Sequence, residues 1–232
     1  MGFKRQISPG KLPRGDELTA AMVGIGMNFG AAPRPDANIE DTLLASSIEG
    51  LERDDLRVLA ILVSWIGVHG STINADRLTA LVDAQPSARV RAFWSAIAKW
   101  RSKDRRFVRL AKVYRGPRVD LLPVGTGFQI ERAGEDPRFA GSALRVPANA
   151  LRDRVGDVLT PRELVRKHRA YRCRVMLGPS YRADMWAELE ADPNLTAAEL
   201  ARRTYGSFAT AWQAKQDFLL LAGQATPSPE TA

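Results

Sequence analysis

The stretch that decides the predicted fold is SARVRAFWSAIAKWRSK, residues 87–103. Large apolar side chains recur in it at steps of three and four residues, which is the period of one helix face; they are Val90, Phe93, Trp94, Ile97 and Trp100. Ser87 follows a proline and is a favourable N-cap residue, so we expect the helix to begin there. The opposite face carries small and basic residues, so it is expected to face solvent or a polyanion.

The sequence on either side of this stretch predicts a winged helix-turn-helix. Upstream, apolar periodicity and capping residues indicate helices over 39–51, 56–68 and 75–83. Downstream, three segments have strand composition and are separated by glycine-containing turns; they are 107–114, 119–124 and 128–131. Three helices with a short middle one, followed by a basic β-ribbon, are typical of that fold.

A second trihelical unit is predicted near the end of the chain, over 180–190, 196–204 and 207–221. The sequence TAAE at 196–199 has the form of a capping box, in which Thr196 and Glu199 satisfy each other's backbone amides. Tyr205-Gly206 then supplies the tight turn of a helix-turn-helix. The predicted fold class is therefore mainly α with a small β-wing, comprising a winged helix-turn-helix and a C-terminal helix-turn-helix-like unit.

Composition shifts divide the chain into five parts. We expect a flexible arm over 1–37, a winged helix-turn-helix domain over 38–132, a connector with one basic helix over 133–178, the C-terminal unit over 179–222 and a disordered tail over 223–232. The longest apolar run, Val58–Val68, is too short to span a bilayer, so no membrane association is expected and the cytoplasm is the expected compartment.

Charge is unevenly distributed along the chain. The 34 Lys and Arg outnumber the 26 Asp and Glu, giving a net charge of +8. Residues 99–118 hold nine basic residues and only one acid, and residues 145–182 hold ten basic residues and three acids. Such clustering is typical of phosphate binding, although a solvated arginine-rich surface is the alternative. Double-stranded DNA is the predicted partner.

The helix-turn-helix geometry selects the candidate DNA-binding residues. In that motif the second helix of the pair reads base edges with its N-terminal half, so Arg91 and Ser95 are the candidate base readers. The other candidates would lie near the DNA backbone: Ser87, Arg89, Lys99, Arg101, Lys103, Arg105, Arg106, Arg115 and Arg118. In the second unit the candidates are Thr210, Gln213 and Gln216. Phe208 and Trp212 there would be exposed together, which fits a protein-binding surface equally well.

Catalytic chemistry is not predicted. The single cysteine, Cys173, excludes a disulfide framework, and His69 and His168 lie far apart in the sequence. No phosphate-binding loop or nucleophile elbow occurs. We expect no enzymatic activity, no metal site and no cofactor.

The chain resembles the winged-helix regulators and antitoxins of bacterial type IV (abortive-infection) toxin–antitoxin operons. The resemblance rests on the pattern over Leu56–Val113, on LTPRELVRKHRAYRCRVMLGPSY at 159–181 and on LTAAELARRTYGSFATAWQAKQDF at 195–218. It implies a DNA-binding transcriptional regulator that controls its own operon and has a nucleotidyltransferase-type toxin as partner. The alternatives are a protein-interaction module with incidental nucleic-acid binding, and RNA binding. The operator, any effector and the oligomeric state remain open.

Overall fold

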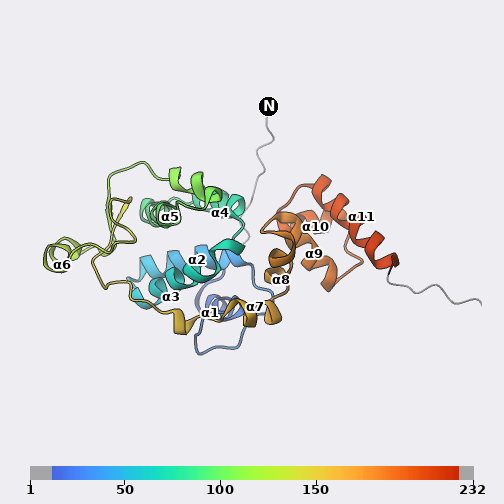
Figure 1. Cartoon of the computed structure of the whole chain (residues 1–232), viewed down its shortest axis with the longest axis horizontal. Coiled ribbons are helices and arrows are strands. Elements are labelled where there is room, and N and C mark those ends of the chain that lie inside the picture. The colour runs from blue at the N-terminus through green and yellow to red at the C-terminus, as the bar shows by residue number, and fades with distance from the viewer. Residues whose placement is uncertain (1–11, 225–232) are drawn as a thin grey trace, which may run out of the picture.

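The computed structural model describes residues 12–224 as a helical N-terminal body joined to a smaller C-terminal helical unit (Figure 1). The helices of the body are α1 (Gly15–Gly24), α2 (Ile39–Glu52), α3 (Leu56–His69), α4 (Ala75–Asp83), α5 (Ala88–Trp100), α6 (Thr126–Ala133) and α7 (Pro161–Lys167). Short 3-10 helices are Gly70–Thr72 (η1), Arg105–Val108 (η2), Leu110–Lys112 (η3) and Val155–Asp157 (η4). The last four helices are α8 (Arg169–Leu177), α9 (Tyr181–Ala191), α10 (Ala197–Thr204) and α11 (Phe208–Gln224). No helix among these residues has the length and apolarity to cross a membrane.

The core of the N-terminal body forms around α3, which is apolar on nearly every side. Helix α2 packs against α3, and α5 packs against α2. Two buried tryptophans find acceptors for their indole N–H groups. Trp65 donates to the carbonyl oxygen of Ile25 at 2.7 Å, and Trp94 donates to Ser47 Oγ at 2.9 Å. Because an unsatisfied buried N–H is costly, these bonds fix how α1 and α2 lie against the core.

The segment predicted as a flexible arm is partly structured. Helix α1 contributes Leu18 and Met22, and Ile25 follows it, in the same buried cluster as α3. The prediction of a flexible arm over 1–37 is therefore wrong for the described residues 12–37. The proline and glycine content that suggested an arm belongs to the turns around α1. Residues 1–11 of that arm, and 225–232 of the predicted tail, lie outside the described residues.

The predicted β-ribbon is also wrong. Residues 105–112 form η2 and η3, in which Phe107 and Leu110 are buried against α5 and Val113 packs beside them. These apolar residues are three apart, which suits 3-10 turns, whereas an alternating strand would place them on opposite faces.

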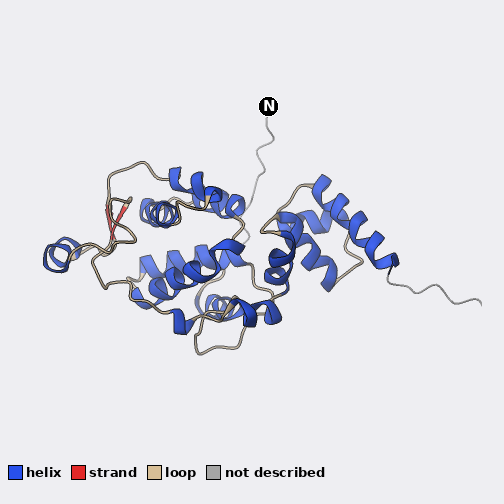
Figure 2. Ribbon diagram, viewed as in Figure 1, coloured by secondary structure: helices blue, strands red, loops and turns tan. Residues whose placement is uncertain are grey.

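The remaining wing residues also depart from prediction. β1 (Val119–Asp120) pairs in parallel with β2 (Leu144–Arg145), and this small sheet stands beside α6 (Figure 2). The strand predicted over 128–131 is helical, because Gly125 adopts a left-handed conformation and the hydroxyl of Thr126 bonds the backbone of Leu122. The mainly helical fold with a small sheet is confirmed, but the sheet is not an antiparallel wing.

The basic connector helix is two helices, α7 and α8, separated at His168. The backbone of His168 is extended, and its Nδ1 accepts a hydrogen bond from the amide of Tyr171 at 3.1 Å, which caps α8. Its Nε2 lies 2.8 Å from the carbonyl oxygen of Ala37 and donates to it. The side chain therefore ties the break to the start of α2.

The C-terminal unit follows the sequence-based prediction closely. Helices α9, α10 and α11 cover nearly the predicted ranges, and both bonds of the capping box between Thr196 and Glu199 are present. Tyr205 adopts the left-handed conformation between α10 and α11. The small core of the unit comprises Met185, Leu189, Leu195, Leu200, Ala211 and Ala214.

Candidate nucleic-acid interface

The basic segment, residues 99–118, leaves α5 and folds back across it as η2 and η3. Buried Phe107 and Leu110 anchor the segment, so the polar side chains between them project into solvent. Four cations are exposed and make no ion pair within the described part of the chain: Lys103, Arg105, Lys112 and Arg115. They lie within 13 residues of one another and are called the free cations below.

Other cations of the basic segment have structural partners. Arg106 pairs with Asp104 at 2.6 Å and donates to the carbonyl oxygens of Ile73 and Gly70, which fastens η2 to the region before α4. Lys99 donates to the carbonyl oxygen of Gly141.

Of three further cations, two make only exposed contacts and the third is hydrogen-bonded to the chain around the sheet. Arg109 forms an ion pair with Asp76 at 3.2 Å, and both side chains are more than 70% exposed. Arg101 lies over the ring of Trp100. Arg118 pairs with Glu135 and donates to the carbonyl oxygens of Ser142 and Leu144, so it braces the chain around the sheet.

The predicted reading face of α5 is covered. Ser95 is buried and donates to the carbonyl oxygen of Ala111 at 2.7 Å, so η3 lies directly on that face. Arg91 donates to the carbonyl oxygen of Gln85. Because the small residues of α5 allow the following chain to pack closely, they admit η2 and η3 instead of a DNA groove. The prediction that Ser95 reads bases is therefore wrong, and the prediction for Arg91, which is half-buried, stays a prediction.

Ser87 and Arg89 also have structural roles. Ser87 caps α5 by accepting from the amide of Val90 at 3.3 Å, as its position predicts. Arg89 donates to the carbonyl oxygens of Leu51 and Leu121 and pairs with Asp54, so it joins α2 to the chain after β1. Both side chains are half-buried and already have partners within the protein.

The candidate residues of the second unit differ in whether their side chains already have hydrogen-bond partners within the protein. Thr210 is held at the start of α11 by Ser207, whose Oγ lies 2.7 Å from the threonine hydroxyl. Gln213 donates to Asp217 Oδ1 at 2.9 Å, whereas Gln216 is exposed. Phe208 and Trp212 are 60% and 51% exposed on the same helix, as predicted.

A buried ion cluster fastens the C-terminal unit to the body. Arg174 of α8 is 2% exposed and lies between Glu40 of α2, at 2.6 and 2.8 Å, and Asp184 of α9, at 2.7 and 2.9 Å. Burial acts to lower the pKa of Arg174, but the two carboxylates outweigh it, so that pKa is raised. Arg77 of α4 completes the cluster, with Nε 3.7 Å from Glu40. Arg174 belongs to the basic stretch 145–182, where no local signal in the sequence distinguishes it from exposed arginines.

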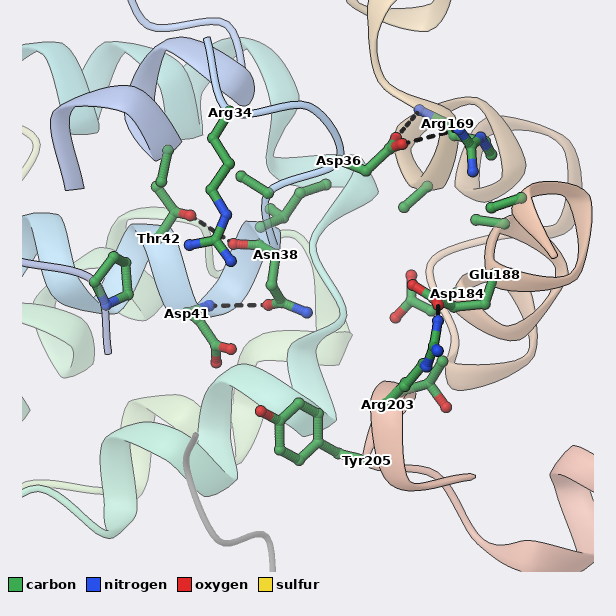
Figure 3. A pocket seen from close by; sticks show the side chains of 18 of the residues that line it. Arg34, Asp36, Asn38, Asp41, Thr42, Arg169, Asp184, Glu188, Arg203 and Tyr205 are labelled. Carbon is green, nitrogen blue, oxygen red and sulfur yellow. Dashed lines mark hydrogen bonds and ion pairs between the residues drawn. The ribbon is translucent and has the colours of Figure 1, made fainter. Parts of the chain in front are cut away.

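A cleft of about 410 Å³ lies beside this cluster, between the start of α2 and the C-terminal unit (Figure 3). Its charged side chains are largely paired with one another: Arg169 meets Asp36 at 3.2 Å, and Arg203 meets Glu188 at 3.3 Å. At its edge the ring of Tyr205 stacks on the guanidinium of Arg77, 3.9 Å from the ring centre. The pair Arg169–Asp36 joins α8 to the chain before α2, whereas the pair Arg203–Glu188 lies within the C-terminal unit and joins α10 to α9.

Both histidines and the single cysteine are buried. His69 lies between Tyr171 Oη, at 2.8 Å from Nδ1, and the carbonyl oxygen of Leu159, at 2.9 Å from Nε2. Burial lowers the pKa of His69 to about 4 and raises the pKa of Cys173 to about 11. Both groups are therefore neutral at pH 7.

No family model, curated protein or solved structure matches the chain.

Proposed function

We propose that this protein binds double-stranded DNA through the basic segment and acts as a bacterial transcriptional regulator. The observation that carries the proposal is the group of free cations, which stand exposed on one short segment and have no carboxylate partner among the described residues. Exposed cations with no carboxylate partner bind phosphate without first breaking an internal ion pair. Binding also releases the counterions condensed on the duplex, which supplies much of the affinity.

The contacts that hold the basic segment on the body also favour DNA binding. Phe107 and Leu110 hold the segment on α5, and Arg106 fastens it to the chain before α4. A segment fixed in this way loses little conformational entropy when it binds. Since Ser95 is covered by η3, base reading by that residue is no longer proposed. Arginine side chains that enter a narrow minor groove read DNA shape, and Arg105 and Arg115 are the candidates for that role.

The test is the salt dependence of binding to a duplex. If each free cation neutralises one phosphate charge, from the backbone or from within the minor groove, the plot of log K against log salt has a slope of about −3.6, since each adds roughly −0.9. Replacing Lys103, Arg105, Lys112 and Arg115 by alanine together should abolish most of that slope. Changing only Arg105 to alanine should reduce its magnitude by about 0.9.

The matched control removes cations that are exposed but paired. Arg53 and Arg172 each bind a glutamate and are 71% and 46% exposed in the side chain, so their replacement by alanine should leave the slope unchanged. Equal loss in the control and the free-cation variants, or binding that is insensitive to salt, contradicts the proposal. Competition between duplex DNA and structured RNA separates DNA binding from RNA binding.

The resemblance to antitoxins extends the proposal to operon autoregulation and a toxin partner. A protein-interaction function has its own support in the exposed pair Phe208 and Trp212. Co-expression with the product of the adjacent gene tests both. A stoichiometric complex that survives 1 M NaCl supports an apolar interface with that partner, because ionic contacts are screened at such a concentration.

A further inference from the structure

A small pocket of about 290 Å³ lies between the first turn of α3 and the chain at residues 149–154. Its polar lining consists of one amide and three guanidinium-bearing side chains, those of Asn149, Arg57, Arg152 and Arg154. The rest of the lining is apolar, and no acidic side chain of the described chain belongs to it. None of these residues lies in the basic segment, so the pocket is a second concentration of positive charge.

The chain that carries two of the arginines is fixed against α3. Ser64, a buried residue of that helix, accepts a hydrogen bond from the amide of Arg154 at 2.9 Å and donates to Asp153 Oδ1 at 3.4 Å. The same carboxylate oxygen accepts from the amide of Val155 at 3.0 Å. Because these bonds hold the backbone on α3, the stretch that carries Arg152 and Arg154 is in place before any ligand binds.

The three guanidinium groups have few partners within the described residues. Arg152 is exposed, and its side chain makes no hydrogen bond or ion pair there. Arg57 is also exposed, and its guanidinium lies 5.8 Å from the ring centre of Phe29, a distance typical of a cation–π contact. Arg154 lies 3.4 Å from Asp157 in a pair open to solvent, which contributes little. Three like charges around so small a pocket repel one another, so they attract an anion placed among them.

Asp55, the acid nearest to Arg57 in the sequence, is engaged as the cap of α3. Its Oδ1 accepts from the amides of Arg57 and Val58, both at 3.0 Å. Asn149, in contrast, is exposed, and its side-chain amide makes no hydrogen bond within the described residues. Its backbone adopts the left-handed conformation, with φ 64°, in which a residue other than glycine is uncommon. The amide of Asn149 is therefore available to an oxygen of a ligand.

We propose that this pocket binds a small phosphate monoester, with the phosphate among the three guanidinium groups. The planar fork of arginine matches two phosphate oxygens at once. A monoester carries a charge of about −1.5 to −2 at pH 7, whereas a carboxylate or a DNA phosphodiester carries a single charge, so the monoester best offsets three cations. The pocket lies at the lower end of the roughly 300–1,000 Å³ of small-molecule sites, so the organic part of the ligand is small. Leu56, Ala60 and Ala150 give that part an apolar surface to contact.

The inference does not rest on DNA binding, because none of its residues belongs to the basic segment. Calorimetric titration of the full chain with glycerol 3-phosphate, at constant ionic strength, should show saturable binding to one site. Arg57→Ala and Arg152→Ala should each weaken that binding about 10-fold or more, the effect of losing one hydrogen-bonded ion pair. Arg53→Ala is the matched control, because Arg53 is 71% exposed, pairs with Glu49 and does not line the pocket. Circular dichroism should show unchanged helix content in all three variants, because the replaced side chains are exposed.

Two comparisons separate recognition of a phosphate monoester from general attraction between charges. Arg152→Lys keeps the charge but loses the fork, so it should also weaken binding. Dimethyl phosphate, which has the single charge of a DNA phosphodiester, should bind more weakly than glycerol 3-phosphate, and a DNA duplex should not displace glycerol 3-phosphate.

The remaining outcomes overturn the proposal. No saturable binding at about 10 mM, a concentration that fills even a site with a Kd of about 1 mM, excludes the site. Equal losses in Arg53→Ala and the pocket variants, or unchanged binding in Arg152→Lys, reduce it to general attraction. Equal binding of dimethyl phosphate, or displacement by the duplex, assigns the pocket to DNA phosphates instead of a small ligand.

Discussion

The buried imidazole of His69 makes the stability of the fold depend on pH in a predictable direction. Its native pKa is about 4 because of burial, against 6.5 for an exposed histidine. Between these two pH values the unfolded chain binds a proton that the native chain does not, so the free energy of unfolding falls as the pH falls. Each unit of pKa difference corresponds to about 1.4 kcal/mol. Between pH 7 and pH 5 the loss is therefore about 2 kcal/mol, and it approaches about 3 kcal/mol near pH 4.

The hydrogen bonds of His69 explain why the neutral form is native. A carbonyl oxygen only accepts, so Nε2 must donate to Leu159, and Nδ1 is then free to accept from the hydroxyl of Tyr171. Both ring nitrogens are satisfied without a charge. Burial lowers the pKa of His168 as well, so it contributes in the same direction.

The assay is urea unfolding at pH 7, 6 and 5, followed by tryptophan fluorescence. His69→Gln keeps a donor for Leu159 and removes the titrating group, so this variant should lose about 2 kcal/mol less than the wild type between pH 7 and pH 5. Its stability at pH 7 serves as the reference for packing changes. Parallel pH profiles for the two proteins, or an NMR titration of His69 near pH 6.5 in the native state, would refute the reasoning.

Two further substitutions test packing within the N-terminal body and at its junction with the C-terminal unit. Arg174→Met leaves the carboxylates of the buried ion cluster without their central partner. It should lower the free energy of unfolding by about 3–5 kcal/mol in chemical denaturation. Changing both carboxylates to amides in the same variant should restore much of that loss, which would confirm the electrostatic cause. Gly24→Ala places a Cβ against the backbone carbonyl of Arg34 and should cost about 1–3 kcal/mol in the same assay. Gly30→Ala meets open space and is its control, and equal effects of the two alanines would contradict the close approach.

The sequence showed the excess positive charge of the candidate site, but the strands predicted for those residues were wrong. The excess of cations in the basic segment is a property of composition and needs no fold to detect it. Which of those cations remain free depends on tertiary partners: Arg106 finds Asp104 and two carbonyl oxygens, whereas Arg105 beside it finds no acid among the described residues. Arg105 and Arg106 are equivalent in the sequence. Their partners differ because those partners depend on how the chain folds back on α5.

The sequence by itself determined the C-terminal unit and the caps of several helices. The capping box at Thr196 and Glu199 spans three residues, and the apolar period of α5 is equally short in range, so both are written in local sequence. Only tertiary structure decided that α5 is covered and that Arg174 is buried. Those outcomes depend on contacts such as Ser95 with Ala111 and Arg174 with Glu40, the latter separated by 134 residues. Local propensity does not encode such contacts, because they form only when the whole core assembles.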